Sequence, residues 1–297
     1  MHAAYAASLS EFGTPRPLPR SGAWILERRI AGSNYSDAMG CYPLCVCSDW
    51  SQLPNDLDQL DNDLVSLTLV TDPFGEYDLG LLRRCFPDLT IPLKEHFVVD
   101  LTRSHENFVR AHHRRNARKA LKDLVVEKCA NPGRLLDDWT ALYGTLIERH
   151  GITGIAAFSR QSFAKQLVVP GVLMFRAIHE ESTVGILLWY VRDKIGYYHL
   201  GAYSSRGYDL RASFALFNYS IEYFAKHGLE WLDLGAGAGT KNTESGLFRF
   251  KQGWSTGVRT AYLCGRIFDK KKYREIVSEK NVPPTDYFPA YRTGEFN

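Results

Sequence analysis

Residues 172–203, VLMFRAIHEESTVGILLWYVRDKIGYYHLGAY, decide the fold. They contain three runs rich in β-branched, aliphatic and aromatic residues, separated by short turn-like segments. Runs of strand length with such spacing are typical of an antiparallel meander. The three predicted strands are 172–178, 184–191 and 197–203.

The chain after this meander predicts a loop, a helix and one more strand. A polar segment, 204–211, precedes a helix over 212–227, in which Phe214, Phe217 and Phe224 recur at helical spacing. A strand over 229–234 follows the helix. A loop between a strand and a helix presents backbone N–H groups at the positive end of the helix dipole, and these suit a phosphate.

This order of elements resembles the core of the GNAT N-acyltransferases. The resemblance implies that two neighbouring strands splay apart, that the acyl-pantetheine arm of an acyl-CoA lies between them, and that its pyrophosphate binds the loop. The family pattern R/Q-x-x-G-x-G/A is matched only in part: the pattern has two residues between the first position and the glycine, whereas Gly207 directly follows Arg206. The residues expected to bind the cofactor are Ser204, Ser205, Arg206, Gly207, Tyr208, Arg211, Ala212 and Ser213.

Residues 246–254, GLFRFKQGW, resemble the FK-x-x-F/W signature of the FemABX and FemAB-like branch, carried here by Phe250, Lys251 and Trp254. The resemblance implies a mixed α+β fold of two GNAT-type halves, with a mainly antiparallel sheet flanked by helices. It also implies aminoacyl-tRNA as an alternative donor. The expected parts are a flexible segment 1–22, an N-terminal GNAT-like half 23–130 and a C-terminal acyltransferase half 131–297.

A strongly basic segment, HENFVRAHHRRNARKALKDL, predicts one helix after Ser104 with a thin apolar stripe that includes Phe108 and Ala117. His112 and His113 are expected on its polar side. Like charges at helical spacing repel, which favours an anion-binding role over a merely solvated surface. The ligand would be a nucleotide-linked acceptor or a tRNA backbone. The substrate-binding candidates are Arg114, Arg115, Asn116, Arg118, Lys119, Phe250 and Trp254.

Acyl transfer to an amine needs a neutral nucleophile, a stabilised oxyanion and a protonated leaving group. By resemblance, Lys251 would stabilise the developing negative charge; the competing interpretation is a solvated lysine on a short amphipathic turn. Strand alternation places His199 and Tyr203 on one face, and Tyr203 could protonate the leaving group, although ordinary packing is an alternative for both. Asp233 and Glu244 are the carboxylates that could deprotonate an amine.

The stretch WLDLGAGAGT, 231–240, resembles the glycine-rich motif of S-adenosylmethionine methyltransferases. A bare glycine pattern is weak evidence. That fold needs further parallel βα units, whereas here a short helical turn, one strand and a tail follow. A methyltransferase is therefore the least favoured alternative.

Composition excludes some other classes. The net charge of +3 indicates no bulk attraction to nucleic acid, and DNA is not an expected partner. Cys41, Cys45 and Cys47 fit no common zinc spacing, so they are expected to be buried thiols, and no metal is expected. The apolar run 184–191 is too short to span a bilayer and no secretory signal is found, which predicts a cytoplasmic protein.

The leading hypothesis is an N-acyltransferase. It would move an acyl group, acetyl in the simplest case, from acyl-CoA to an amine of a sugar, a peptide or a small biosynthetic intermediate by direct attack. The alternatives are an aminoacyl-tRNA-dependent ligase of FemABX type and a non-catalytic binding protein that retains the fold.

Overall fold

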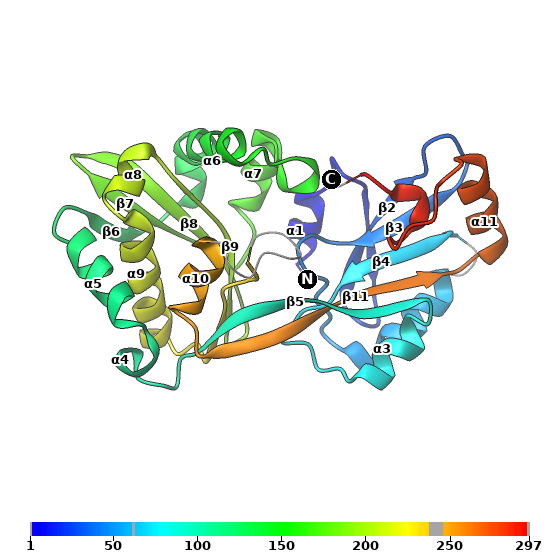
Figure 1. Ribbon diagram of the computed structural model, residues 1–297, viewed down its shortest axis with the longest axis horizontal. Coiled ribbons are helices and arrows are strands. Elements are labelled where there is room, and N and C mark those ends of the chain that lie inside the picture. The colour runs from blue at the N-terminus through cyan, green and yellow to red at the C-terminus, as the bar shows by residue number, and fades with distance from the viewer. Residues whose placement is uncertain (1, 61–62, 238–245, 296–297) are drawn as a thin grey trace. The chain divides into compact units, whose positions relative to one another are not determined.

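The computed structural model describes residues 2–60, 63–237 and 246–295, which form two compact units (Figure 1). Unit 1 comprises Met1–Lys94, Thr153–Lys165 and Thr260–Asn297. Unit 2 comprises Glu95–Ile152 and Gln166–Arg259. Among the described residues, none of the helices has the length and apolar character needed to cross a membrane.

Unit 1 contains a small meander whose last strand has a parallel neighbour. The first three strands pair antiparallel in chain order, the fourth pairs parallel to the third, and the C-terminal part of a late strand pairs antiparallel to the fourth. These strands are β1 (Thr14–Leu18), β2 (Ala23–Arg29), β3 (Ser36–Gly40), β4 (Ser66–Val70) and β11 (Gly257–Ile267).

Short helices surround the strands of unit 1, and its core contains Ile25, Trp50, Leu67 and Leu69 with four buried cysteines. The helices are α1 (Ala3–Ser8), α2 (Leu53–Leu57), α3 (Leu79–Cys85), α7 (Arg160–Gln166), which ends at the first residue of a unit 2 segment, and α11 (Lys270–Glu279). Five short 3₁₀ turns, one of them in unit 2, complete the regular structure: Trp50–Gln52, Asp58–Leu60, Pro132–Leu135, Gly154–Ala156 and Ala290–Arg292.

Unit 2 repeats the same strand order on a larger scale. Four strands pair antiparallel in sequence, the next strand pairs parallel to the last of them, and the end of an early strand pairs antiparallel to that one. They are β6 (Val125–Lys128), β7 (Val172–His179), β8 (Ser182–Arg192), β9 (Ile195–Tyr203), β10 (Trp231–Asp233) and β5 (Leu89–Asp100). The predicted meander over 172–203 is confirmed.

Helix α9 (Ala212–Lys226) packs its apolar stripe, including Phe217, Ile221 and Phe224, against one face of the unit 2 strands. Buried Trp189 of β8 meets the rings of Phe217 and Phe224 there. The remaining helices of unit 2 are α4 (His105–Phe108), α5 (Ala111–Ala120), α6 (Leu136–His150), α8 (Ser205–Asp209) and α10 (Gly246–Gln252).

The two units do not follow the predicted boundaries near residues 22 and 130. Strand β5 begins in unit 1 and ends in unit 2, while β11 does the reverse, so each unit takes a strand from a distant part of the chain. Sequence patterns report local structure and give no sign of such an exchange. The basic segment consequently belongs to unit 2.

Two local predictions are wrong. Residues 1–22 were expected to be flexible, yet they contain α1 and β1, because Tyr5 is buried and donates to Tyr42 O at 2.8 Å. The basic segment forms two helices, α4 and α5, since Val109 leaves the helical conformation with ψ 127°. His113, expected on the polar side, is buried.

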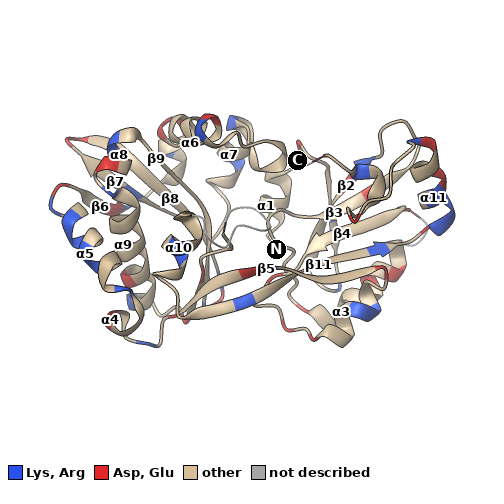
Figure 2. Cartoon of the chain, viewed as in Figure 1, with Lys and Arg blue, Asp and Glu red and all other residues tan. Residues whose placement is uncertain are grey.

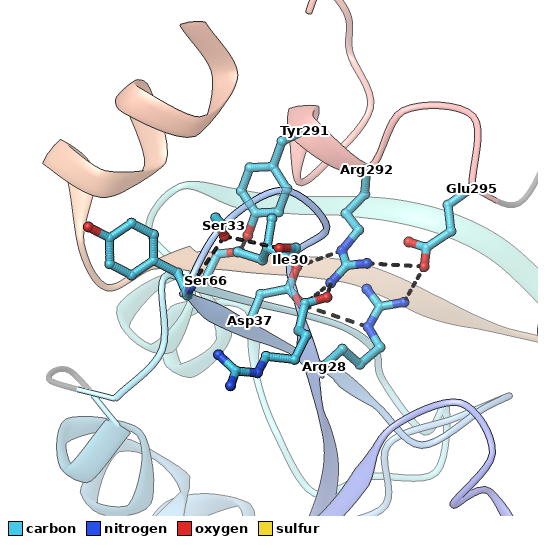
Figure 3. A network of polar contacts seen from close by, with 10 residues as sticks. Arg28, Ile30, Ser33, Asp37, Ser66, Tyr291, Arg292 and Glu295 are labelled. Atoms are coloured by element: carbon cyan, nitrogen blue, oxygen red, sulfur yellow. Dashed lines mark hydrogen bonds and ion pairs between the residues drawn. The ribbon is translucent and has the colours of Figure 1, made fainter. Parts of the chain in front are cut away.

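A buried ion network ties the C-terminal segment of unit 1 to its meander (Figure 3). Asp37 in β3 is fully buried and accepts from Arg292 Nη2 at 2.8 Å and Nε at 2.9 Å. Arg28 Nε lies 3.7 Å from the same carboxylate and its Nη1 donates to Glu295 at 2.9 Å. Tyr291 shares a 2.7 Å hydrogen bond with Ser66 in the same region.

Asp37→Asn should strongly destabilise the protein, because it leaves two arginines beside a neutral amide in a buried site. Removing one partner of a buried pair costs about 3–5 kcal/mol. Urea denaturation followed by circular dichroism measures the change. The matched control is Asp58→Asn, whose carboxylate is 67% exposed and pairs with Arg266 at 3.2 Å, and which should cost about 1 kcal/mol or less. Equal losses in the two variants would contradict the importance of the network.

Candidate active site

The site of unit 2 begins where β9 and β10 separate. The two strands pair only through Ile195–Tyr197 and Trp231–Asp233. After Asp233 the chain follows β5 instead, since Leu234 N donates to Phe97 O at 2.8 Å and Phe97 N donates to Gly235 O at 3.1 Å. Strand β9 continues alone to Tyr203, and no described residue pairs with it on that side. The predicted splay between these strands is thus present.

Unit 1 lacks an equivalent opening. There β3 and β4 also pair parallel, but Cys45 then bridges to the end of β4: its N–H donates to Val70 O at 2.7 Å and its carbonyl accepts from Asp72 N at 3.1 Å. The cysteines expected to be buried thiols are indeed buried and outside any disulfide, and burial raises the pKa of Cys41 to about 12. The candidate donor site is therefore the opening in unit 2.

The strand pairing assigns each side chain near the separation to one of two sheet faces. Leu232 and Tyr198 lie on the face packed by α9, called here the α9 face. Asp233 pairs with Tyr197 of β9 and Val98 of β5, so it lies on the opposite face, called here the α6 face. Helix α6 packs on that side.

Lys251 lies at the point of separation. Its side chain is 6% exposed, and Nζ donates to Ala236 O at 2.7 Å. The ammonium is 5.3 Å from the centre of the Tyr198 ring. Gly235 has φ +73°, and a Cβ there would lie 3.1 Å from Nζ. The competing interpretation of Lys251 as a solvated lysine on a surface turn is wrong, because α10 places this side chain among buried protein groups.

The two aromatic residues of the FK-x-x-W motif hold α10 in place. The ring of Phe250 lies 4.9 Å from Phe217 and 5.0 Å from Phe214, both on α9. Trp254 is fully buried and packs against the same helix. Their packing on α9 explains why the intervening Lys251 points toward the separated strands.

Two tyrosine hydroxyls converge over Gly201. A Cβ built on this glycine would meet Tyr198 Oη at 2.5 Å and Tyr203 Oη at 3.2 Å. Burial raises the pKa of both phenols above the ordinary value. Both hydroxyls therefore keep their protons at neutral pH and can donate hydrogen bonds.

His199 does not share a face with Tyr203, so that prediction is wrong. The pairing of β8 with β9 shifts between Leu188 and Trp189, and His199 is the extra residue of this bulge. One inserted residue reverses the alternation. His199 turns to the α6 face, where Nε2 lies 3.0 Å from Gln166 Oε1, and burial lowers its pKa to about 3.

Asp233 is paired with His96, a residue that the sequence did not indicate. His96 Nδ1 lies 3.0 Å and 2.9 Å from the two carboxylate oxygens. Gly235 N donates to Oδ1 of the same carboxylate at 2.7 Å. Asp233 is 2% exposed and His96 is 8% exposed. The two residues are 137 positions apart, and only the pairing of β5 with β10 brings them together.

The predicted phosphate loop lies beyond the other end of β9. Ser204 caps α8, and its side chain accepts from Gly207 N at 3.1 Å. A Cβ on Gly207 would meet Val184 O at 2.0 Å, which requires glycine there. Helix α9 then starts after Arg211 without a side-chain cap. No described residue accepts from the N–H groups of Ala212 and Ser213.

The rest of the loop faces outward. Ser205, Arg206, Tyr208 and Arg211 are exposed, Arg206 Nη2 lies 3.4 Å from His179 Nε2, and Arg149 of α6 stacks over the Tyr208 ring at 4.3 Å. Among the predicted cofactor-binding residues, Ala212 and Ser213 at the N-terminus of α9 offer backbone N–H donors, and Arg211 lies beside them.

Helix α5 carries its cations outward (Figure 2). Its buried side packs on α9, and His113 Nε2 lies 3.0 Å from Phe250 O of α10. Burial lowers the pKa of His113. Arg114 is used internally, donating to Glu106 O at 2.7 Å and to Val109 O, and Asn116 is hydrogen-bonded to His112 at 2.9 Å. The exposed cations of the predicted set are Arg115, Arg118 and Lys119.

Comparison with known proteins agrees with this geometry. Residues 107–252 match the family model of the acetyltransferase (GNAT) domain. This part of the chain is a GNAT-type acyltransferase domain. A search of curated protein sequences gives no match. Among the described residues, no cluster of histidine, cysteine, aspartate and glutamate is able to hold a metal.

Solved structures share the fold over nearly the whole chain. FemX is similar with a TM-score of 0.66 and 15% identity, over 92% of this chain and 93% of that one. The C-terminal domain (DUF2156) of a candidate lysylphosphatidylglycerol synthetase from Agrobacterium fabrum gives 0.65 and 16%, over 95% and 92%. The L-PGS structure from Bacillus licheniformis gives 0.59 and 15%, over 94% and 96%. The predicted fold class, α+β with two GNAT-type halves of FemAB-like kind, is confirmed.

Two predicted features fall on 238–245, outside the described residues: Glu244 and the end of the glycine-rich stretch. Gly235 marks the described start of that stretch, where the backbone turns toward β5 and passes Lys251. In the described residues 246–295 no parallel βα units follow, so the methyltransferase alternative has no structural support there.

His199 should remain neutral far below the ordinary range of histidine, because its folded pKa is about 3 against a model-peptide value of 6.5. NMR titration of the ring signals, assigned with His199→Gln, should show no protonation step between pH 7 and 5. Since the unfolded chain takes up a proton below pH 6.5, the wild-type stability should fall relative to His199→Gln as the pH drops from 6.5 toward 3. A midpoint near pH 6 would contradict this burial.

Proposed function

We propose that the protein transfers an acyl group from acyl-CoA to an amine of a sugar, a peptide or another small biosynthetic intermediate, by direct attack without a covalent enzyme intermediate. The observation that carries the proposal is the unpaired edge of β9, which runs from Lys251 to the open N-terminus of α9. Six residues of extended strand span about 20 Å. An extended acyl-pantetheine arm with phosphates at one end fits such an edge.

The N-terminus of α9 supports the assignment of the phosphates to this end. The uncapped N–H groups of Ala212 and Ser213 and the helix dipole favour an anion there. Arg211 is exposed beside them and can form charge-assisted hydrogen bonds to phosphate. The other predicted loop residues, from Ser204 to Tyr208, are proposed to shape this site through α8.

Lys251 and the tyrosines supply the groups needed at the thioester. In the proposal, the Lys251 ammonium stabilises the oxyanion that forms when the amine attacks the carbonyl carbon. A tyrosine hydroxyl near Gly201, that of Tyr203 or Tyr198, protonates the departing thiolate, since burial keeps both phenols protonated. Acyl-CoA and tRNA are both cytoplasmic, so the reaction is assigned to the cytoplasm.

Ser213→Glu should weaken acetyl-CoA binding at least about tenfold, because it places a carboxylate where the phosphates bind. One such factor of ten is about 1.4 kcal/mol. Titration calorimetry measures the dissociation constant. The control is Lys226→Glu, which also adds negative charge, but at the exposed far end of α9. This variant should bind acetyl-CoA normally. Unchanged affinity in Ser213→Glu would remove the α9 terminus from the donor site.

Lys251→Met should lower kcat by about 10²–10³-fold with little change in acetyl-CoA affinity, since removing one oxyanion donor has that effect in acyl transfer. Thiol release from acetyl-CoA in the presence of amines measures kcat. Lys165→Met provides a comparison, because Lys165 Nζ donates to Ala7 O and Ser10 Oγ of unit 1. Full activity of Lys251→Met would refute the role of Lys251 and leave the fold assignment untouched.

An aminoacyl-tRNA donor is the second candidate. The exposed cations of α5 suit a phosphate backbone, and the structural likeness to FemX and to L-PGS is compatible with aminoacyl transfer. The same β9 edge and Lys251 would then act on an ester, with a ribose oxygen as leaving group. On this alternative the acceptor still supplies an amine or another nucleophile.

The donor can be decided with charged tRNA. If tRNA is the donor, Arg118→Glu with Lys119→Glu should reduce transfer of the labelled aminoacyl group and flatten the salt dependence, whereas acetyl-CoA turnover should not change. Lys270→Glu with Lys271→Glu on α11 carries the same charge change at an exposed helix of unit 1. Failure of charged tRNA to yield any product would eliminate this candidate.

A further inference from the structure

The His96–Asp233 pair has the geometry of an oriented imidazole. A carboxylate can only accept, so Nδ1 is the donor in the 2.9–3.0 Å contacts with both oxygens of Asp233. When the ring is neutral, this fixes the lone pair on Nε2. No described residue forms a hydrogen bond with Nε2, and the histidine side chain remains 10% exposed. The free nitrogen is therefore available to an incoming molecule.

Asp233 itself is poorly placed to meet a substrate. Its side chain is 3% exposed, and its oxygens are taken up by His96 and by Gly235 N at 2.7 Å. From the sequence, this carboxylate is one of two candidate bases, with Glu244. The geometry instead makes Asp233 the group that holds the ring, and leaves His96 as the group with an open nitrogen.

The pair and Lys251 reach the separated strands from opposite faces. His96 lies two residues from Val98, the β5 partner of Asp233, and so shares its α6 face. Lys251 comes from α10, which packs on the α9 face beside Phe217. Both are linked to Gly235: its N–H donates to Asp233, and a Cβ built on it would lie 3.1 Å from Lys251 Nζ.

We infer that His96 is the general base that deprotonates the acceptor amine, with Asp233 as its positioning residue, and that the acceptor approaches from the α6 face. The inference rests on the proposed function. In the step, the amine nitrogen bonds to the carbonyl carbon and its proton passes to His96 Nε2. The C–S bond breaks as the intermediate collapses, and the thiolate takes a proton from a tyrosine hydroxyl. Solvent then restores the tyrosine proton and removes that of His96.

The test uses the full chain with acetyl-CoA, and with glucosamine and a lysine-containing peptide as amine probes. His96→Ala should lower kcat at least about 10²-fold, the usual range for a general base, and leave the KM for acetyl-CoA unchanged. Added imidazole should restore part of the rate in proportion to its concentration. Asp233→Asn should lower kcat with the same unchanged KM. His227→Ala, at an exposed histidine stacked on Tyr223, should keep full activity, and added imidazole should not change its rate.

The possible outcomes distinguish failure of the His96 assignment from failure of the proposed function. If the wild-type protein releases thiol and His96→Ala has an unchanged kcat, the inference is overturned but the proposed function is not. A loss that imidazole does not restore, while acetyl-CoA still binds and the variant melts as the wild type does, also overturns it and reduces His96 to a structural role. A wild-type protein that binds no acetyl-CoA and releases no thiol overturns the proposed function, and this inference with it. If His96→Ala fails to fold, His96→Gln takes its place, and normal kcat in that variant overturns the assignment.

Discussion

The short parallel pairing of β9 with β10 is the constraint on which the site depends. Only three residues of β10 pair with β9, and the same three residues pair with β5 on the other side. Beyond Asp233 the described chain keeps its backbone hydrogen bonds to β5 and not to β9, so the edge of β9 stays open as far as Tyr203. The groups argued to bind acyl-CoA and to act on the thioester lie along that edge or at its two ends.

Packing on the two faces of the sheet then decides which side chain reaches the separation point. On the α9 face, Phe250 and Trp254 anchor α10 against α9 and direct Lys251 inward. On the α6 face, the pairing of β5 with β10 sets His96 against Asp233. The aromatic motif residues therefore act through position, and the chemistry is left to a small number of polar groups.

The repeated strand order explains why the chain holds two related units and one argued site. Unit 1 has the same meander and the same parallel fourth strand, but Cys45 closes the place where its strands would separate. Its stability rests in part on charged groups, with Asp37 enclosed by Arg28 and Arg292 (Figure 3). Similar backbones thus carry different roles, because a few residues fill or free one strand edge.

The sequence alone determined the meander, helix α9 and the loop before it, and it made Lys251 a candidate, because hydrophobic period and short motifs report local structure. It could not place His199, since a single bulge residue reverses which face a strand side chain takes. Nor could it find His96, whose partner lies 137 residues away, or the exchange of β5 and β11 between the units. These features depend on which strands pair, and tertiary structure decides that through contacts between distant segments.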